Sequence, residues 1–353
     1  MVHRGAVVAR VVIGLFVLAS WWAGASSAAC TRALWAGQDG LVVTGRTMDW
    51  MEDLHTDLWA FPRGMKRHGR AGAGSIEWTS RYGSVIAAGY NAGSADGMNE
   101  RGLVMNLLYL AESDYGDHNG KPGLSVSLWG QYALDNFATV AESVEALKKE
   151  PFRIVAPALP NGKASSLHLS LSDASGDSAI FQYVDGRLMV HHGRQFTVMT
   201  NSPVFDQQLA LNAYWQEIGG LVMLPGTNRA ADRFARACFY VSKLPQTPEP
   251  RQGVAGVFSV MRNVTVPLGI SDPQRPNIAT TIWTVAAEHR SRTYYFQDSL
   301  SPNICWVALD KLDLNAGSPA RKLDLQGSPR PMPSGEVSGQ FEPAQPFVFL
   351  GVD

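Results

Sequence analysis

Cysteine is scarce in this sequence, which has only three such residues, Cys30, Cys238 and Cys305, among 353. Because the three lie far apart, they form neither a disulfide-rich pattern nor a zinc-binding motif. Cys238 and Cys305 could pair with each other, but each lies in an apolar run, where a buried free thiol is the commoner outcome. We therefore expect these two thiols to be free and buried.

A strong excess of one charge is also lacking. Residues 1–29 hold two of the 30 basic residues and none of the 31 acidic ones, so residues 30–353 have 28 basic against 31 acidic residues. This balance does not favour nucleic acid or an anionic membrane as a partner. The chain has no internal repeat, phosphate-binding loop or Gly-x-Ser-x-Gly elbow, and the spacing of His168, His191 and His192 fits no metal site. We expect no bound metal.

Long hydrophobic runs are missing except near the start of the chain, where residues 11–20 are apolar and follow the basic Arg4 and Arg10. These ten residues are too few to span a membrane stably, and small residues lead from them to Ala29. The pattern predicts a signal peptide over residues 1–29 that is cleaved after Ala29. We therefore expect an exported protein, periplasmic or secreted, with no stable membrane insertion after processing.

Two other interpretations of this segment remain open. The apolar run could be an uncleaved signal anchor, or Cys30 could be the acylated first residue of a lipoprotein. A lipid-modified cysteine normally follows a bulky aliphatic residue three positions upstream, where this chain has Ser27. Cleavage is the favoured prediction, and it leaves residues 30–353, which no clear linker divides, as a single domain.

Cleavage after Ala29 would place a thiol and a free α-amine on the same residue, Cys30. An α-amine has a reference pKa of roughly 7.7–8.0, so it can accept the proton of the thiol near neutral pH. One residue would then supply both a nucleophile and its base, as an N-terminal threonine does in related arrangements. The sequence therefore predicts a nucleophile at Cys30, against which the rest of the chain would hold an amide.

The apolar pattern after Cys30 alternates between groups of strands and groups of helices. A hairpin with strands over 31–35 and 41–48 comes first, and long loops without regular period are expected over 52–80. Further strands are predicted over 103–110, 166–200 as a meander, 280–287, 292–297 and 305–312. This order indicates two packed sheets with helices outside them.

Four helices are predicted between the strands. The best supported begins at Thr139, which has capping-box spacing with Glu142, and ends before Pro151. The other three are expected over 124–135, 206–217 and 231–244. Residues 315–345 are rich in Pro, Gly and Ser and are expected to form an irregular tail.

Arg46 and Asp49 follow Cys30 by sixteen and nineteen residues. A hairpin that returns past Cys30 would bring both side chains beside it. An arginine near a thiol favours the thiolate, and a carboxylate near an α-amine can orient the amine by accepting its hydrogen bonds. Alone, such residues at a strand end are more often turn or salt-bridge residues, so this prediction depends on the motifs that accompany them.

Five ordered segments carry a resemblance to a known family. They are Cys30, Arg46 with Asp49, residues 96–103 (DGMNERGL), residues 200–203 (TNSP), and residues 224–226 (LPG) leading to 232–236 (DRFAR). Together they resemble the choloylglycine hydrolase family of N-terminal nucleophile hydrolases, which includes penicillin V acylases and conjugated bile salt hydrolases. The resemblance covers nearly all of residues 30–353. It implies an α+β fold, a four-layer αββα sandwich of two antiparallel sheets.

The resemblance also implies an activity. The chain would hydrolyse the linear amide of a small-molecule N-acyl substrate without a cofactor, and, like many members of the family, it would form a homotetramer. Cys30 would be both nucleophile and base, and Arg46 and Asp49 would organise its thiol and amine. An alternative from another class is a non-catalytic exported lipoprotein or binding module that retains the fold.

Further site residues follow from the same resemblance. Asn201 would donate its side-chain amide to the oxyanion of the tetrahedral intermediate, together with the backbone N–H of Tyr109. Arg233 would complete the polar network around the thiol. Arg236 is a rival for that role, because the Arg-Phe-Ala-Arg segment holds two arginines three residues apart.

Tyr109 and Trp50 indicate the substrate. Bile salt hydrolases of the family tend to have asparagine at the position of Tyr109 and penicillin acylases tyrosine. Trp50, directly after Asp49, further resembles the exported acylases of Gram-negative bacteria, some of which also cleave N-acyl homoserine lactones. Both aromatic rings would suit a flat or aliphatic acyl group. We therefore expect a penicillin V acylase type of activity, with conjugated bile salt hydrolysis as the alternative.

Overall fold

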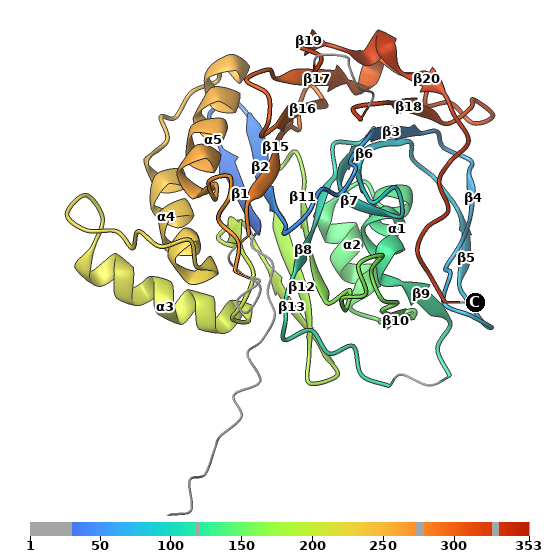
Figure 1. Ribbon diagram of the computed structural model, residues 1–353, viewed down its shortest axis with the longest axis horizontal. Coiled ribbons are helices and arrows are strands. Elements are labelled where there is room, and N and C mark those ends of the chain that lie inside the picture. The colour runs from blue at the N-terminus through green and yellow to red at the C-terminus, as the bar shows by residue number, and fades with distance from the viewer. Residues whose placement is uncertain (1–29, 118–119, 273–278, 327–331, 353) are drawn as a thin grey trace, which may run out of the picture.

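Two antiparallel β-sheets lie face to face at the centre of the molecule (Figure 1). The computed structural model describes residues 30–117, 120–272, 279–326 and 332–352. The predicted signal peptide, residues 1–29, lies outside these residues.

The first sheet positions Cys30. Within the described residues it has the strand order β14-β1-β2-β15-β16-β17-β19, antiparallel except for the β17–β19 pair. These strands are β1 (Cys30–Ala36), β2 (Val42–Asp49), β14 (Val198–Met199), β15 (Thr281–Glu288), β16 (Thr293–Asp298), β17 (Cys305–Ala308) and β19 (Gly335–Glu336). β1 and β2 form the predicted hairpin, in which Cys30 pairs with Met48. Because β1 lies between β2 and β14, Cys30 is close to the segment that follows β14.

The second sheet is antiparallel throughout its described strands, in the order β13-β12-β11-β8-β7-β6-β3-β18-β20. They are β3 (Leu58–Phe61), β6 (Ser84–Gly89), β7 (Gly93–Asn99), β8 (Val104–Tyr109), β11 (Leu167–Ser172), β12 (Ser178–Val184), β13 (Arg187–His192), β18 (Arg321–Leu323) and β20 (Glu342–Pro343). β8 is buried along its whole length, as its apolar sequence predicts. β11 to β13 form the predicted meander.

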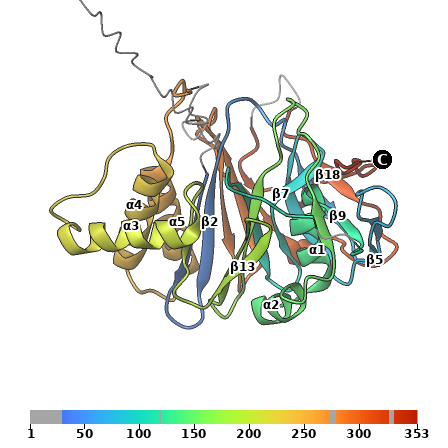
Figure 2. The same cartoon turned by 90° about the horizontal axis from the view of Figure 1, so that it is seen from below.

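Helices cover the outer face of each sheet (Figure 2). α3 (Phe205–Ile218), α4 (Ala230–Lys243) and α5 (Pro250–Val264) lie beside the first sheet, and α1 (Trp129–Asn136) and α2 (Val140–Leu147) lie against the second. The predicted four-layer αββα sandwich is therefore confirmed. No helix in the described part of the chain is long and apolar enough to cross a membrane.

Local signals account well for the start of α2. The Thr139 side chain accepts a hydrogen bond from the Glu142 backbone N–H at 3.2 Å, as the capping-box spacing predicts. The Glu142 carboxylate reaches back to the N–H of Ala138, one residue before the cap. Three short 3-10 helices complete the regular structure of the described residues: Val126–Leu128, Leu309–Lys311 and Ser338–Gln340.

Four predictions about local structure are wrong. The irregular tail expected over 315–345 contains β18, β19 and β20, which pair into the two sheets, and the 3-10 helix Ser338–Gln340. Residues 52–80 contain β3 and the small hairpin of β4 (Lys66–His68) and β5 (Glu77–Thr79), which are too short for a period of two to show in the sequence. Residues 124–135 are not one helix, because β9 (Gly123–Ser125) pairs in parallel with β10 (Arg153–Val155) before α1 begins. The predicted strand over 305–312 ends at Ala308 and turns into a 3-10 helix.

The helix α5 was not predicted from the sequence, although its signals are present. Pro250 lies in the first turn, and Val254, Val257, Phe258 and Met261 recur on one buried face. α5 packs against β2 and β15 and so supports the strand that contains Arg46 from behind.

Polar contacts join the facing sides of the two sheets. The Thr44 hydroxyl lies 2.9 Å from the Ser172 hydroxyl, linking β2 to β11, and the Tyr294 hydroxyl donates to Asp96 at 2.8 Å, linking β16 to β7. All four side chains are buried. Since a buried polar group without a partner is costly, these pairs hold the two sheets in a specific register.

Gly45, beside Arg46 in β2, allows α5 to approach the sheet closely. A Cβ atom at this position would lie 2.5 Å from Val257 Cγ1 and 2.9 Å from Met261 Cγ. We expect Gly45→Ala to lower the free energy of unfolding by about 1–3 kcal/mol, because overpacking displaces side chains or backbone. Gly339→Ala is the control, since its Cβ would meet nothing within 4 Å. Urea unfolding of both variants checks this, and equal midpoints would contradict it.

Candidate active site

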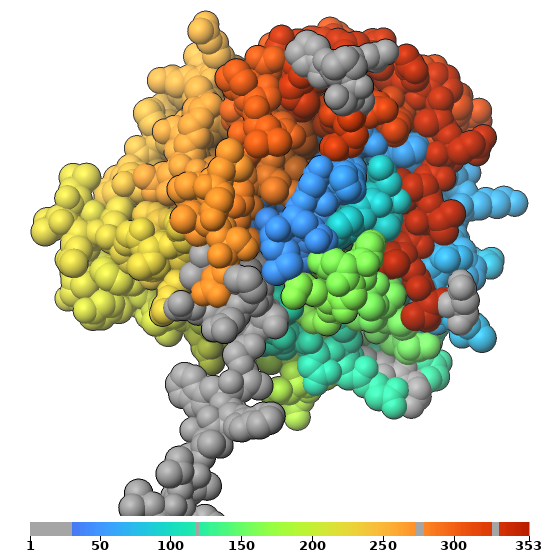
Figure 3. Space-filling model, viewed as in Figure 1, coloured from blue at the N-terminus to red at the C-terminus, as the bar shows by residue number. Residues whose placement is uncertain are grey.

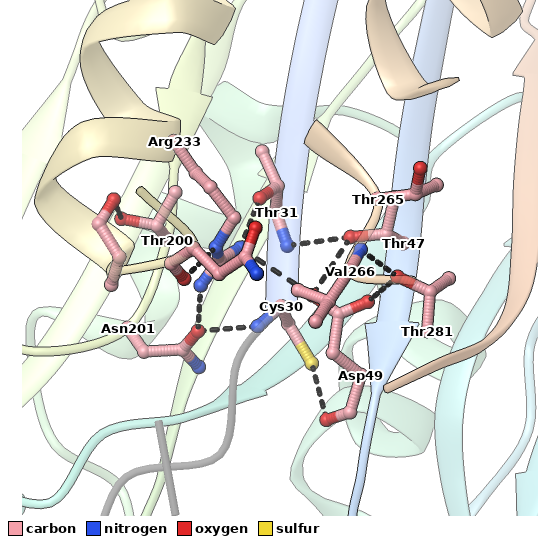
Figure 4. A network of polar contacts seen from close by, with 12 residues as sticks. Cys30, Thr31, Thr47, Asp49, Thr200, Asn201, Arg233, Thr265, Val266 and Thr281 are labelled. Carbon is pink, nitrogen blue, oxygen red and sulfur yellow. Dashed lines mark hydrogen bonds and ion pairs between the residues drawn. The ribbon is translucent and has the colours of Figure 1, made fainter. Parts of the chain in front are cut away.

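Cys30 opens β1 at the inner end of an apolar pocket and is only 2% exposed. The chain still carries residues 1–29, so the Cys30 nitrogen is a peptide nitrogen. It stands for the α-amine that cleavage after Ala29 would expose. The side chain and the nitrogen of Cys30 contact different groups, and Figure 4 shows the network that surrounds the nitrogen.

Arg46 lies beside the thiol, as the hairpin predicts. Its Nη2 is 3.6 Å from Cys30 Sγ and also donates to the backbone carbonyl of Leu107 at 3.0 Å. The guanidinium is fully buried, and its carbon lies 4.6 Å from the centre of the Trp283 ring. A buried cation at this distance favours the thiolate over the thiol.

Asn201 lies at the nitrogen of Cys30, because β14 pairs with β1 and ends just before it. Its Oδ1 accepts hydrogen bonds from the Cys30 nitrogen and from Arg233 Nη2, the latter at 3.1 Å (Figure 4). Its Nδ2 donates to the carbonyl of Tyr109 at 2.6 Å. The amide nitrogen carries two hydrogens, so a second donor remains for an oxyanion. The oxyanion role of Asn201 stays a prediction.

Tyr109 ends β8 at an edge that β7 leaves open. The pairing of β7 with β8 ends at Asn106. Beyond it, side chains replace the β7 backbone as donors: Arg46 donates to the carbonyl of Leu107, and Asn201 donates to the carbonyl of Tyr109. In an antiparallel strand the N–H and C=O of one residue point to the same side. The Tyr109 N–H therefore shares this open edge with its carbonyl, which is consistent with the predicted oxyanion donor.

Asp49 is near the Cys30 nitrogen but does not bind it in this structure. Its carboxylate accepts hydrogen bonds from the hydroxyls of Thr281 and Thr47 and lies 3.5 Å from Arg233 Nη1. Burial raises the pKa of Asp49 to about 6, and the Arg233 guanidinium opposes this rise. The carboxylate is therefore ionised at neutral pH. In the uncleaved chain Asp49 thus binds Arg233 and two threonine hydroxyls, and its hydrogen bond to the free α-amine of Cys30 stays a prediction.

The structure places Arg233, not Arg236, in this network. Arg233 is fully buried and donates to the Thr31 hydroxyl as well as to Asn201 (Figure 4). Arg236 instead donates to the backbone carbonyls of Pro225 and Thr227 at 2.7 and 2.8 Å and holds the loop before α4. Residues three apart are neighbours on a helix, so the contacts of the folded chain, and not the helix itself, distinguish the two arginines.

Trp50 and Tyr109 line the pocket that leads to Cys30. Their ring centres are 5.8 Å apart, and Met48, Leu54, Leu107 and Leu167 add to the apolar wall. Among the pocket residues Arg46 is the one that carries a charge. Figure 3 shows the face where the segments 50–54, 89–95 and 159–167, in blue, cyan and green, meet at the surface. Such a pocket suits an uncharged apolar group.

Tyr90 is a pocket residue that the sequence did not single out. Its hydroxyl donates to Glu52 and accepts a hydrogen bond from Trp50 Nε1 at 2.8 Å, which fixes the indole. Thr31 and Thr281 were also missed, and each binds a charged side chain of the network. A threonine on a strand has no distinctive signal in the sequence, whereas the positive φ of 55° at Tyr90 is visible only in the fold.

The histidines bind other side chains, as predicted, and Cys238 and Cys305 are both free, although only Cys305 is buried as expected. His191 and His192 each bind a carboxylate, from Asp206 and Asp177, and buried His168 binds Gln182. No group of three or more metal-ligating side chains occurs among the described residues.

All three cysteines are free, and burial raises the pKa of the Cys238 and Cys305 thiols to about 12 and 11. Cys238 is only partly buried, whereas Cys305 is fully buried.

Comparison with known proteins identifies the family of this site. A family model for linear amide C–N hydrolases, choloylglycine hydrolase family, matches residues 30–322 and thus begins at Cys30. The chain belongs to this family. A choloylglycine hydrolase family member is an enzyme that cleaves linear amide bonds, so the binding-module alternative falls away.

Two penicillin V acylases are similar to this family member over most of its length. The chain is 47% identical to "Penicillin V acylase" of Pectobacterium atrosepticum, over the full length of both proteins. A structure of penicillin V acylase from Agrobacterium tumefaciens is 52% identical with a TM-score of 0.86, covering 92% of this chain and 100% of that chain.

Bile salt hydrolases are more distant. "Bile salt hydrolase/transferase" of Clostridium perfringens is 26% identical and covers 81% of this chain and 94% of its own length. A variant of conjugated bile acid hydrolase from the same species has a TM-score of 0.72 and 25% identity, covering 84% of this chain and 97% of that chain.

The two neighbouring arginines of α4 allow a matched test of the network. We expect Arg233→Lys to lower kcat by about tenfold or more, because a single ammonium cannot bind Asn201, Thr31 and Asp49 as the guanidinium does. Arg236→Lys should leave kcat close to the parent value and reduce thermal stability instead. Steady-state kinetics and melting curves of both variants check this, and the reverse pattern would assign the role to Arg236.

Proposed function

We propose that this protein is an exported amidohydrolase of the penicillin V acylase type, with Cys30 as an N-terminal cysteine nucleophile. The observation that carries the proposal is the convergence on one residue of two separate sets of contacts. Arg46 lies beside the Cys30 thiol, and Asn201 with Arg233 surrounds the Cys30 nitrogen. A catalytic cysteine that uses its own α-amine as base needs both sets.

The reaction follows from this arrangement. The α-amine takes the proton of the thiol, and the thiolate attacks the amide carbonyl to form a tetrahedral oxyanion. Asn201 Nδ2 and the Tyr109 N–H donate to that oxygen, the resulting α-ammonium protonates the leaving amine, and a thioester to Cys30 remains. Water activated by the α-amine then hydrolyses the thioester and releases the acid. No cofactor takes part in these steps.

Export and processing are part of the same proposal. The family model begins at Cys30. Residues 30–353 make up 324 of 353 residues, and the Agrobacterium tumefaciens acylase covers a similar share of the chain, 92%. Together with the predicted signal peptide, these matches support cleavage after Ala29 and a periplasmic or secreted enzyme. An acylated lipoprotein remains the alternative.

An oligomer is also proposed. α3 and the loop after it expose apolar side chains, among them Leu211, Tyr214, Leu221 and Val222, of which Leu221 is 92% exposed. Exposed apolar side chains that cluster on a surface often contact another protein. A second copy of this chain would cover it, in keeping with the tetramer that the resemblance implies.

Replacement of the nucleophile tests the mechanism. Cys30→Ser should fold normally and lose nearly all turnover, because an alcohol yields far less anion than a thiol under the same base. The measurement is kcat on a phenoxyacetyl amide, together with intact mass to establish that parent and variant both begin at residue 30. Turnover near the parent value in the variant, or a mature parent enzyme that retains residues before Cys30 or a lipid on it, would contradict the proposal.

The pocket leads to a prediction about substrate class. Trp50 and Tyr109 narrow an apolar pocket, so a phenoxyacetyl or medium aliphatic acyl group should fit better than a steroid. We expect penicillin V, and to a lesser extent N-acyl homoserine lactones, to show kcat/KM about 10–200-fold above glycine- or taurine-conjugated bile acids. Parallel assays on the processed enzyme decide this. A bile-acid preference would favour the conjugated bile salt hydrolase alternative and leave Cys30 as the nucleophile.

A further inference from the structure

Asp96 shares the Arg46 guanidinium with Cys30. Arg46 Nη1 lies 3.5 Å from Asp96 Oδ2, and Arg46 Nη2 lies 3.6 Å from Cys30 Sγ. The two anionic partners therefore contact different nitrogens of the same cation. Asp96 belongs to the motif of residues 96–103, to which neither the sequence nor the proposed reaction assigned a role.

The carboxylate of Asp96 is held in place by two other strands. The Asn106 side-chain amide donates to its Oδ2 at 2.7 Å, and the Tyr294 hydroxyl donates to its Oδ1 at 2.8 Å. Asp96 and Tyr294 are fully buried and Asn106 almost so, and no water is needed to satisfy either carboxylate oxygen. A carboxylate so fixed can act on Arg46 but cannot move to the substrate.

Arg46 would keep its position without the charge of Asp96. Its Nε donates to the Thr47 carbonyl at 3.1 Å, and its Nη1 and Nη2 donate to the carbonyls of Ala95 and Leu107 at 3.2 and 3.0 Å. The ion pair with Asp96 is longer than these bonds. The carboxylate therefore contributes mainly charge, and in a buried site such a charge acts over several ångströms.

We propose that Asp96, fixed by Tyr294 and Asn106, is a positioning residue that offsets part of the positive charge of Arg46 and thereby sets how strongly the Cys30 thiolate is stabilised. The inference rests on the proposed role of Cys30 as nucleophile. A thiolate that is stabilised too strongly is a weaker nucleophile. By offsetting part of the Arg46 charge, Asp96 would therefore keep the Cys30 thiol reactive near the working pH.

The other charged groups at the site fit this balance. Asp49 opposes Arg233 on the nitrogen side of Cys30, so Arg46 and Arg233 each have one buried carboxylate partner. Burial raises the pKa of Asp96 to about 6 against the opposing effect of Arg46, so the carboxylate is ionised at neutral pH. The pKa of Tyr294 lies well above its ordinary value, because burial and Asp96 disfavour its anion, and it remains a neutral donor.

The test is the pH dependence of alkylation of Cys30 in the processed enzyme. Iodoacetamide labelling at each pH, quantified by peptide mass spectrometry, separates Cys30 from the Cys238 and Cys305 thiols. We expect Asp96→Asn to move the midpoint for Cys30 to lower pH by about one unit, because Arg46 then acts on the thiolate without its counter-charge. The acid limb of kcat/KM should move in the same direction, and the plateau of kcat should fall.

Two further variants keep the test decisive. Asp135→Asn removes an equally buried carboxylate, paired with Arg67 at 3.3 Å, that contacts neither Arg46 nor Cys30, and it should leave the midpoint unchanged. Tyr294→Phe removes one donor to Asp96 and so favours its neutral form. It should shift the midpoint in the same direction as Asp96→Asn but less, and it serves if the aspartate variant does not fold.

The outcomes separate this inference from the proposed function. If Cys30 of the parent enzyme is alkylated with loss of activity but the midpoint is unchanged or rises in Asp96→Asn or Tyr294→Phe, the inference is wrong and the nucleophile stands. An equal shift in Asp135→Asn also overturns the inference, because it assigns the effect to general destabilisation. If alkylation of Cys30 leaves turnover intact, the proposed function itself fails.

Discussion

Two buried ion pairs on either side of Cys30 are the constraint on which the site depends. Arg46 faces Asp96 on the thiol side, and Arg233 faces Asp49 on the nitrogen side. Removing one partner of such a pair would leave an uncompensated buried charge, at a cost of about 3–5 kcal/mol. The strands and helices that contribute these four side chains must therefore stay in register, and Cys30 is held where the pairs meet.

The layered fold makes this arrangement possible. Arg46 and Asp49 come from β2 of the first sheet, Asp96 from β7 of the second, and Arg233 from α4 on the outer face. Three of the four layers thus contribute a charge to the site, and α5 packs closely against β2 at Gly45. The wall of the pocket that leads to these charged side chains is apolar. A substrate in the pocket would therefore meet charge only at the bond that reacts.

Short-range signals account for the parts of the fold that were predicted correctly. The β1–β2 hairpin has a turn between two extended segments, and α2 has its cap at Thr139, so both are encoded within a few residues. β3 and β9 could not be predicted, because their partners lie elsewhere in the chain. β4 and β5 pair with each other, but three residues in each strand are too few for a period of two to show. α5 was missed although its amphipathic face was readable.

The sequence by itself determined the chemistry that is available: a cysteine directly after a predicted signal peptide, an arginine and an aspartate one hairpin away, and the motifs that place the chain in its family. Only the tertiary structure decided which groups act together. It selected Arg233 over Arg236, turned Asp49 towards Arg233, and brought Asp96 to the far side of Arg46. These choices depend on contacts between residues 50 to 200 positions apart, which no local pattern specifies, because the direction of a buried side chain is set by the layers that enclose it.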